Sequence, residues 1–134
     1  MGLVSQERVE TVRRLYEQFA ATRELPAALF APDFVWDMST FQGWLERPEY
    51  EGFEGTMEFL RDWVGIWDEW DAGLEELRDA DDRVVAIACQ YGRAEETGVP
   101  LEMRYGQVWT FRGEQLIRAE TYLDPREALE AAGL

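Results

Sequence analysis

Apolar side chains recur at helical spacing in the first part of the chain, between Ser5 and Thr22. Ser5 is the expected N-cap of this amphipathic helix, because a serine oxygen can accept from the first free backbone N–H groups. The segment PAALFAP predicts a short second helix or turn, and the alternation in DFVWDM predicts a half-buried strand. Residues 39–53, which include Gly43 and Gly52, are expected to form a loop long enough to serve as a lid or pocket rim.

The stretch RDWVGIWDEWDA, residues 61–72, holds three tryptophans. Trp63, Trp67 and Trp70 follow the spacing i, i+4 and i+7, which places them on one face of a helix. This pattern predicts a helix from about Glu54 to Trp70. Its aromatic stripe either packs in the core or forms the wall of an apolar pocket, and both interpretations stay open.

After the tryptophans the apolar period changes from that of a helix to that of a strand. Short connections rich in turn-forming residues make the predicted strands consecutive antiparallel neighbours. The final stretch DPREALEAAGL predicts a short helix with Asp124 as its cap, Pro125 at its first position and Gly133 after its end. The predicted strands cover residues 72–79, 83–95, 99–111 and 115–123.

The strand at 99–111 carries a single polar residue, Gln107, on a face that is otherwise apolar. That face is expected to point inward, and a buried amide there needs a hydrogen-bond partner. On the last strand the same alternation places Arg118, Glu120 and Tyr122 on the opposite, outer face. The inward face of the strand consists of Leu101, Met103, Tyr105, Gln107, Trp109 and Phe111.

Length and composition narrow the class of protein. At 134 residues the chain is expected to form one domain, 1–134, with a single core. Its formal net charge of -15 would repel phosphate backbones and anionic lipids, so nucleic acid and membranes are not expected partners. The one cysteine, Cys89, cannot form an intrachain disulfide, and no secretion signal precedes the first helix, so a cytoplasmic location is expected.

The chain contains no histidine, lysine or asparagine. Histidine is the usual zinc ligand and general base, and lysine supplies the amine of Schiff bases, so chemistry here must use carboxylates, Tyr, Arg, Gln or Cys. The carboxylate runs DADD and DEWD lack the spacing and the turn glycine of a calcium loop. We therefore expect no metal site and no cofactor.

The order of elements and stretches such as LYEQF, LFAPDFVWDM and YEGFEGTMEFLRDW resemble the nuclear transport factor 2-like superfamily, in particular its SnoaL-like, ketosteroid isomerase-like branch. The resemblance implies an α+β fold in which a strongly curved, mostly antiparallel sheet is wrapped by N-terminal helices into a cone with an internal pocket. It also implies a homodimer formed through the outer face of the sheet. Val108, Leu116 and Tyr122, expected on that face, are more apolar than a solvated face needs and favour the same homodimer. The superfamily hosts many activities, so the resemblance specifies fold better than chemistry.

Ketosteroid isomerases pair a carboxylate base with an oxyanion hole made by a tyrosine and a protonated aspartic acid. By resemblance, Tyr16 in LYEQF matches the tyrosine, and Gln107 stands where the aspartic acid would be, able to donate a hydrogen bond but not a proton. An ungapped count places the base position on Met38, and Asp37, one residue away, is the nearest carboxylate. Asp37, Tyr16 and Gln107 are therefore the candidate catalytic residues.

These observations predict a pocket for a flat, apolar, polyketide-like or steroid-like small molecule. The protein is either a cofactor-independent isomerase, cyclase or dehydratase that acts by proton transfer, or a binding or dimeric assembly module without turnover, and the sequence leaves open whether it is an enzyme. The predicted ligand-binding residues are Trp36, Met38, Phe59, Trp63, Trp67, Met103, Tyr105 and Trp109.

Overall fold

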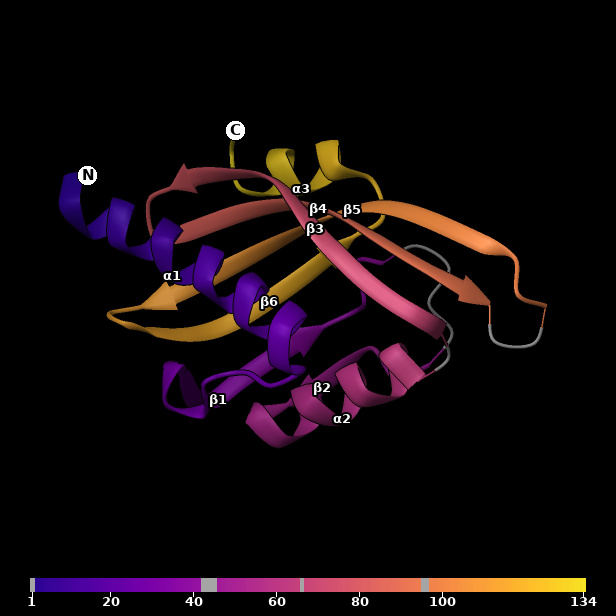
Figure 1. The fold of residues 1–134 in the computed structure, drawn as a ribbon. Helices are drawn as coiled ribbons and strands as arrows, with labels where there is room; N and C mark the ends of the chain where they lie inside the picture. Colours follow the sequence, from indigo (N-terminus) through magenta and orange to yellow (C-terminus); the bar gives the residue numbers. More distant parts are fainter. Residues whose placement is uncertain (1, 42–45, 66, 95–96) are drawn as a thin grey trace.

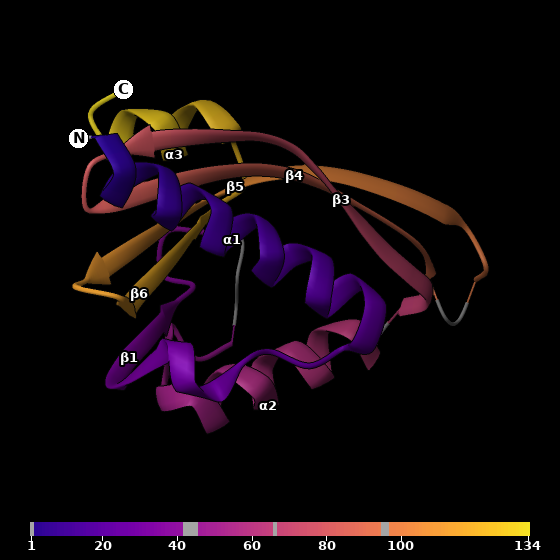
Figure 2. The ribbon, with the colours of Figure 1, turned by 60° about the vertical axis from the view of Figure 1, so that its left-hand side comes forward.

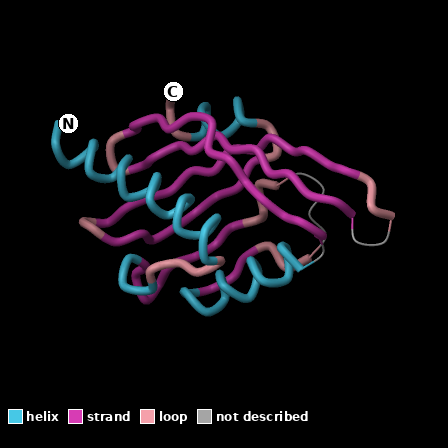
Figure 3. The backbone as a smooth tube through the Cα atoms, in the orientation of Figure 1, coloured by secondary structure: helices cyan, strands magenta, loops and turns pink. Residues whose placement is uncertain are grey.

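The computed structural model describes residues 2–41, 46–65, 67–94 and 97–134 (Figure 1). A six-stranded sheet has the order β2-β1-β6-β5-β4-β3, in which β1 is parallel to β6 and every other neighbouring pair is antiparallel. The long strands are strongly curved (Figure 3). The α+β class and the curved sheet are as expected. The elements are α1 (Gly2–Thr22), η1 (Ala27–Leu29), β1 (Phe30–Asp37), β2 (Glu49–Glu51), α2 (Gly52–Gly65), β3 (Trp67–Ala80), β4 (Arg83–Ala94), β5 (Pro100–Arg112), β6 (Gln115–Tyr122) and α3 (Pro125–Ala131).

Helices cover both faces of the sheet: α1 and α2 lie on the concave side and α3 on the other (Figures 1 and 2). The alternation of side chains along β4 explains the two layers. Val84 and Ala86 join the larger core under α1 and α2, whereas Val85 and Ile87 join a smaller cluster under α3. Because β4 is buried on both faces, its sequence is a continuous apolar run rather than an alternating one.

The close approach of α3 to the sheet depends on Gly106. A Cβ atom at this position would lie 2.6 Å from the Cβ of Ala128 and 3.2 Å from the Cα of Pro125. The helix itself begins as the sequence predicts, with the Asp124 side chain accepting from the backbone N–H of Arg126 and Pro125 at its first position.

The first helix differs from the prediction at its start. Because α1 already includes Gly2, Ser5 lies inside the helix and is buried, so the assignment of Ser5 as N-cap is wrong. The predicted loop at 39–53 is also shorter, since Glu49–Glu51 pair with β1 and Gly52 opens α2. Gly43 lies outside the described residues, and the role of the loop as a lid or pocket rim stays a prediction.

The predicted helix from Glu54 to Trp70 is wrong at its C-terminal end. Helix α2 ends at Gly65, and β3 begins at Trp67, while Ile66 lies outside the described residues. Glycine is a poor helix former and aromatic residues favour strands, which explains the change at this point. The i, i+4, i+7 spacing of the tryptophans therefore does not report a single helix face.

A bulge in β3 keeps Trp67 and Trp70 on the concave side of the sheet. The pairing with β4 shifts by one residue between Asp68 and Asp71, and Glu69 has a positive φ of 55°. An extra residue changes which positions face inward, so both indoles can contact the α2 side of the molecule. The ring of Trp67 lies 5.8 Å from that of Trp63.

The outer face of the sheet carries less apolar surface than the sequence indicates. Val108 is buried under α3 together with part of Tyr122, and Leu116 is buried in the larger core. Leu116 faces inward because the β5–β6 register shifts between Thr110 and Phe111. The argument from these residues for a homodimer is therefore wrong, and the homodimer itself stays a prediction. Within the described ranges, no helix has the length and apolar character needed to span a membrane.

Candidate ligand-binding cavity

A cavity of about 90 Å³ lies between α1, α2 and the concave face of the sheet. Its described lining includes nine of the predicted site residues: Tyr16, Trp36, Met38, Phe59, Trp63, Met103, Tyr105, Gln107 and Trp109. Trp67 does not line it and instead packs against Trp63, because α2 ends at Gly65 and Trp67 lies on β3 rather than on the predicted helix. Trp70 also contributes to the lining.

Small residues on neighbouring strands leave room for the large side chains around the cavity. Opposite Tyr105 on β5 lies Ala88 of β4, and opposite Trp109 lies Ala119 of β6. Both alanines are fully buried. An alanine beside each ring leaves volume for that ring within the closely packed interior.

Gln107 occupies the centre of a hydrogen-bond chain on the cavity wall. The indole Nε1 of Trp109 donates to the Tyr16 hydroxyl at 3.1 Å, the Tyr16 hydroxyl donates to Gln107 Oε1, and Gln107 Nε2 donates to Thr121 Oγ1 at 3.1 Å. The prediction that the buried Gln107 amide has a hydrogen-bond partner is confirmed. These hydrogen bonds join α1, β5 and β6, so they have a structural role whether or not a ligand oxygen also bonds to one of the groups.

The two tyrosines of the cavity are held in the neutral form. Burial raises the pKa of Tyr16 well above its usual value, with Tyr105 adding to the effect and the Trp109 hydrogen bond opposing it. Burial likewise raises the pKa of Tyr105. Both phenols therefore stay protonated at neutral pH, where each can donate a hydrogen bond but cannot accept a proton as a base.

Gln90 on β4 is a lining residue that the sequence analysis missed. Its Oε1 accepts from Trp63 Nε1 at 2.9 Å and from Trp70 Nε1 at 3.0 Å, which joins α2 to β3 and β4. An indole N–H can only donate, so two of them fix the oxygen end of the amide toward the tryptophans. The signal was present, since Val84, Ala86, Ala88 and Gln90 are alternate residues of one strand face.

Two buried donors of the lining have no hydrogen-bond partner among the residues that the structure describes. They are Gln90 Nε2 and Trp36 Nε1, on side chains that are each 4% exposed. Leaving a buried donor unpaired costs about 1–3 kcal/mol, so such groups normally meet an acceptor or a water molecule. Both unsatisfied buried side-chain groups among the described lining residues are therefore donors.

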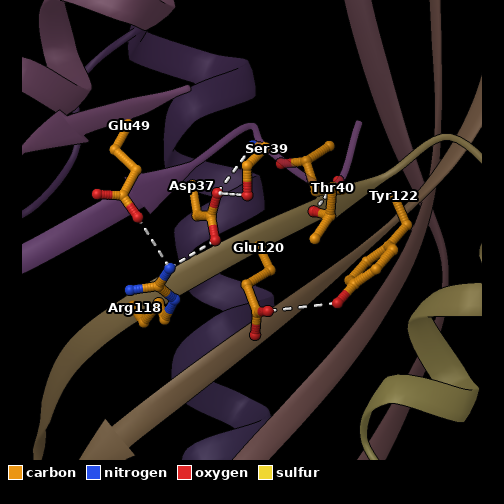
Figure 4. Close-up of polar contacts among 8 residues, drawn as sticks. Asp37, Ser39, Thr40, Glu49, Arg118, Glu120 and Tyr122 are labelled. Carbon is orange, nitrogen blue, oxygen red and sulfur yellow. Dashed lines mark hydrogen bonds and ion pairs between the residues drawn. The ribbon is translucent and has the colours of Figure 1, made fainter. Parts of the chain in front are cut away.

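Asp37 lies outside the cavity, which corrects its assignment as the pocket base. Trp36 and Met38 point into the cavity, and Asp37 between them points to the opposite face of β1, as strand alternation requires. Figure 4 shows its carboxylate beside Arg118 and Ser39. Asp37 Oδ1 accepts from the backbone N–H of Ser39 at 2.8 Å and from its hydroxyl at 2.6 Å, and Oδ2 accepts from Arg118 at 2.5 Å.

The Asp37 carboxylate is held in its charged form. Burial by itself would raise its pKa, but the hydrogen bonds from Ser39 and the charge of Arg118 outweigh burial and lower the pKa. Arg118 also contacts Glu49 at 3.2 Å, which fastens β2 to the β1–β6 pair. Nearby, the Tyr122 hydroxyl donates to the Glu120 carboxylate at 3.3 Å (Figure 4). Burial raises the pKa of Tyr122 to about 12. Glu120 lies on this outer face, as predicted.

Neither the cavity nor the outer cluster offers metal ligands in a suitable group. Within residues 2–41, 46–65, 67–94 and 97–134, no three His, Cys, Asp or Glu side chains are arranged to hold a metal ion. Cys89 is a buried free thiol, and burial raises its pKa. A raised pKa keeps the thiol protonated and unreactive.

Comparison with protein families shows to which family the chain belongs. The SnoaL-like domain matches residues 12–119 of the chain. The protein belongs to the SnoaL-like family. No curated protein sequence matches the chain significantly.

Solved structures with the same fold include a SnoaL-like member. A putative SnoaL-like polyketide cyclase from Jannaschia sp. CCS1 is 20% identical with a TM-score of 0.78, over 98% of this chain and 95% of that one. A hypothetical protein with a ketosteroid isomerase-like fold from Catenulispora acidiphila, in complex with trimethylamine, is 17% identical with a TM-score of 0.71, over 93% of each chain. TerC co-crystallised with polyporic acid is 19% identical with a TM-score of 0.69, over 94% and 98%.

Proposed function

We propose that this SnoaL-like protein binds a small, flat, largely apolar molecule in the cavity between α1, α2 and the sheet. The observation that carries the proposal is the lining itself. Aromatic and aliphatic side chains surround the space, and the polar groups among the described lining residues are neutral amides, hydroxyls and indole N–H groups. An apolar cavity with a few oriented polar groups is the usual form of a small-molecule site.

The structural neighbours support this proposal at the level of the fold. One of them was crystallised with polyporic acid and another with trimethylamine, so related cones accommodate small organic molecules. A further neighbour is a putative polyketide cyclase. A polyketide-like or steroid-like compound is the class of ligand that these relatives and the aromatic lining together favour.

The proposal is one of binding rather than of proton transfer. Catalysis by isomerase, cyclase or dehydratase chemistry needs a base with a suitable pKa in contact with the ligand. Asp37 faces away from the cavity, and the titratable groups in the described lining, Tyr16 and Tyr105, have raised pKa values. Turnover of enolisable ketones or polyketide intermediates that disappears in Tyr16→Phe would favour the catalytic alternative and contradict this choice.

A variant whose added side chain fills the cavity tests whether a ligand binds there. Ala20 lines the cavity from α1, whereas Ala21 beside it is exposed. The neutral dye N-phenyl-1-naphthylamine should bind the wild type and Ala21→Phe with increased fluorescence. In Ala20→Phe its affinity should fall by roughly tenfold or more, because the added ring occupies space that the dye needs; tenfold corresponds to about 1.4 kcal/mol. Equal binding to all three proteins, or to none, would refute the proposal.

A further inference from the structure

We infer that the side-chain amide of Gln90 donates a hydrogen bond to the ligand, and that the ligand therefore carries a neutral carbonyl-type oxygen. This inference rests on the proposed binding function and specifies the chemistry of the molecule that the cavity takes.

The side-chain amide of Gln90 has one orientation. Both indole donors, Trp63 Nε1 and Trp70 Nε1, are directed at Oε1, at 2.9 and 3.0 Å. Turning the amide over would bring its NH2 group against two N–H groups and lose both bonds. The Nε2 end must therefore point away from the tryptophans, with two hydrogens to donate.

The burial of Gln90 carries the second step. The side chain is 4% exposed, it lines the cavity, and its Nε2 has no partner among the described residues. A buried NH2 group needs an acceptor, and a water molecule can serve until a ligand displaces it. A ligand that offers an acceptor oxygen replaces that water, whereas a hydrocarbon leaves the amide unpaired.

Gln90 is a polar position separate from the Gln107 chain. In the sheet, Gln90 is paired with Met103 of β5, which lies four residues before Gln107. Four residues of extended strand span roughly 13 Å. The Gln107 amide is bonded to Tyr16 and Thr121, so the unpaired Nε2 of Gln90 marks a different end of the cavity.

Charge decides between a neutral and an anionic oxygen. The described lining contains no arginine, and the chain has a net charge of -15, so a carboxylate ligand would enter an unfavourable field without a cationic partner. A ketone, quinone or similar carbonyl supplies the acceptor without that cost.

The test compares two probes that differ only in the carbonyl, 1-indanone and indane. Their dissociation constants are measured by calorimetric titration on the wild type, on Gln90→Met and on Gln18→Met, an exposed glutamine on α1 that serves as the matched control. In the wild type 1-indanone should bind at least as tightly as indane. In Gln90→Met the affinity of 1-indanone relative to indane should fall by roughly tenfold, the value of one hydrogen bond to a buried carbonyl, and in Gln18→Met it should not change.

The ratio of the two affinities separates the inference from the proposed function. If both probes bind the wild type and Gln90→Met leaves their ratio unchanged, the inference is wrong and the cavity remains a binding site. If neither probe binds the wild type, the proposed function fails, and the inference with it.

A measurement on the wild type covers the case in which Gln90→Met does not fold. The chain has no asparagine, so the carboxamide NH2 signals in a ¹⁵N–¹H correlation spectrum come from its six glutamines alone. The Gln90 pair is assigned through its proximity to the Trp63 and Trp70 indoles. With 1-indanone its proton signals should move downfield, and indane should not reproduce that shift. Identical shifts with both probes would overturn the inference.

Discussion

Replacing Gln107 by leucine should lower stability, because the Gln107 amide ties the first helix to the sheet. The side chain is 4% exposed, accepts from Tyr16 and donates to Thr121. Each stranded polar partner costs about 1–3 kcal/mol, and the buried leucine offsets part of this. We expect a net loss of about 1–3 kcal/mol, which lowers the unfolding temperature by several degrees for a chain of this size.

A double-mutant cycle isolates the bond between the two side chains. Tyr16→Phe removes the Tyr16–Gln107 hydrogen bond by deleting its donor. Each single variant loses this bond, and the double variant loses the same bond, so its cost is counted twice in the sum of the single variants. Urea unfolding followed by circular dichroism should show the double variant less destabilised than the sum of the single variants, by about 0.5–3 kcal/mol. Gln18→Leu on the exposed face of α1 is the control for the substitution. Additive effects, within about 0.5 kcal/mol, would refute the assigned network.

Three further predictions concern the rest of the fold. Gly106→Ala should have a lower melting temperature than the wild type, because its Cβ would lie 2.6 Å from that of Ala128 and overpacking costs about 1–3 kcal/mol. Gly73→Ala, where the added Cβ has room, should keep the melting temperature of the wild type. Equal melting temperatures for the two variants would contradict this prediction. The pKa of Asp37 is lowered, so its contribution to stability is complete above its unfolded pKa of about 3.9 and is lost as the pH falls through the lower folded value. The stability difference between wild type and Asp37→Asn, from urea titrations, should therefore shrink toward acid pH, and a constant difference would count against the ion pair. Sedimentation equilibrium at micromolar concentration tests the predicted homodimer, which a clean monomer would exclude.

The sequence predicted the strands and the final helix well because their patterns are local. The change to a two-residue period after the tryptophans, the turn residues and the Asp124–Pro125 pair each depend on near neighbours. The same alternation identified Gln107 as an inward polar residue. Applied to the strand at 83–95, it would also have found Gln90, which follows Val84 on the same face.

The errors arose where the pattern is set by contacts far apart in the sequence. A single-residue bulge at Glu69 and a register shift after Thr110 each change which side chains face inward, and no local signal gives their positions. Asp37 is the carboxylate nearest to the expected base position, but the ungapped count places that position on Met38. The structure follows the count, because strand alternation orients a side chain whatever its charge.

Whether the cavity admits a small apolar molecule can be seen in a crystal structure of the protein grown with 1-indanone. We expect electron density for the compound within the cavity, in contact with the rings of Trp36, Trp63 and Tyr105. A structure in which the protein's own indole rings fill this space and the compound is absent from it would contradict the claim, and the tryptophans would then be core residues alone.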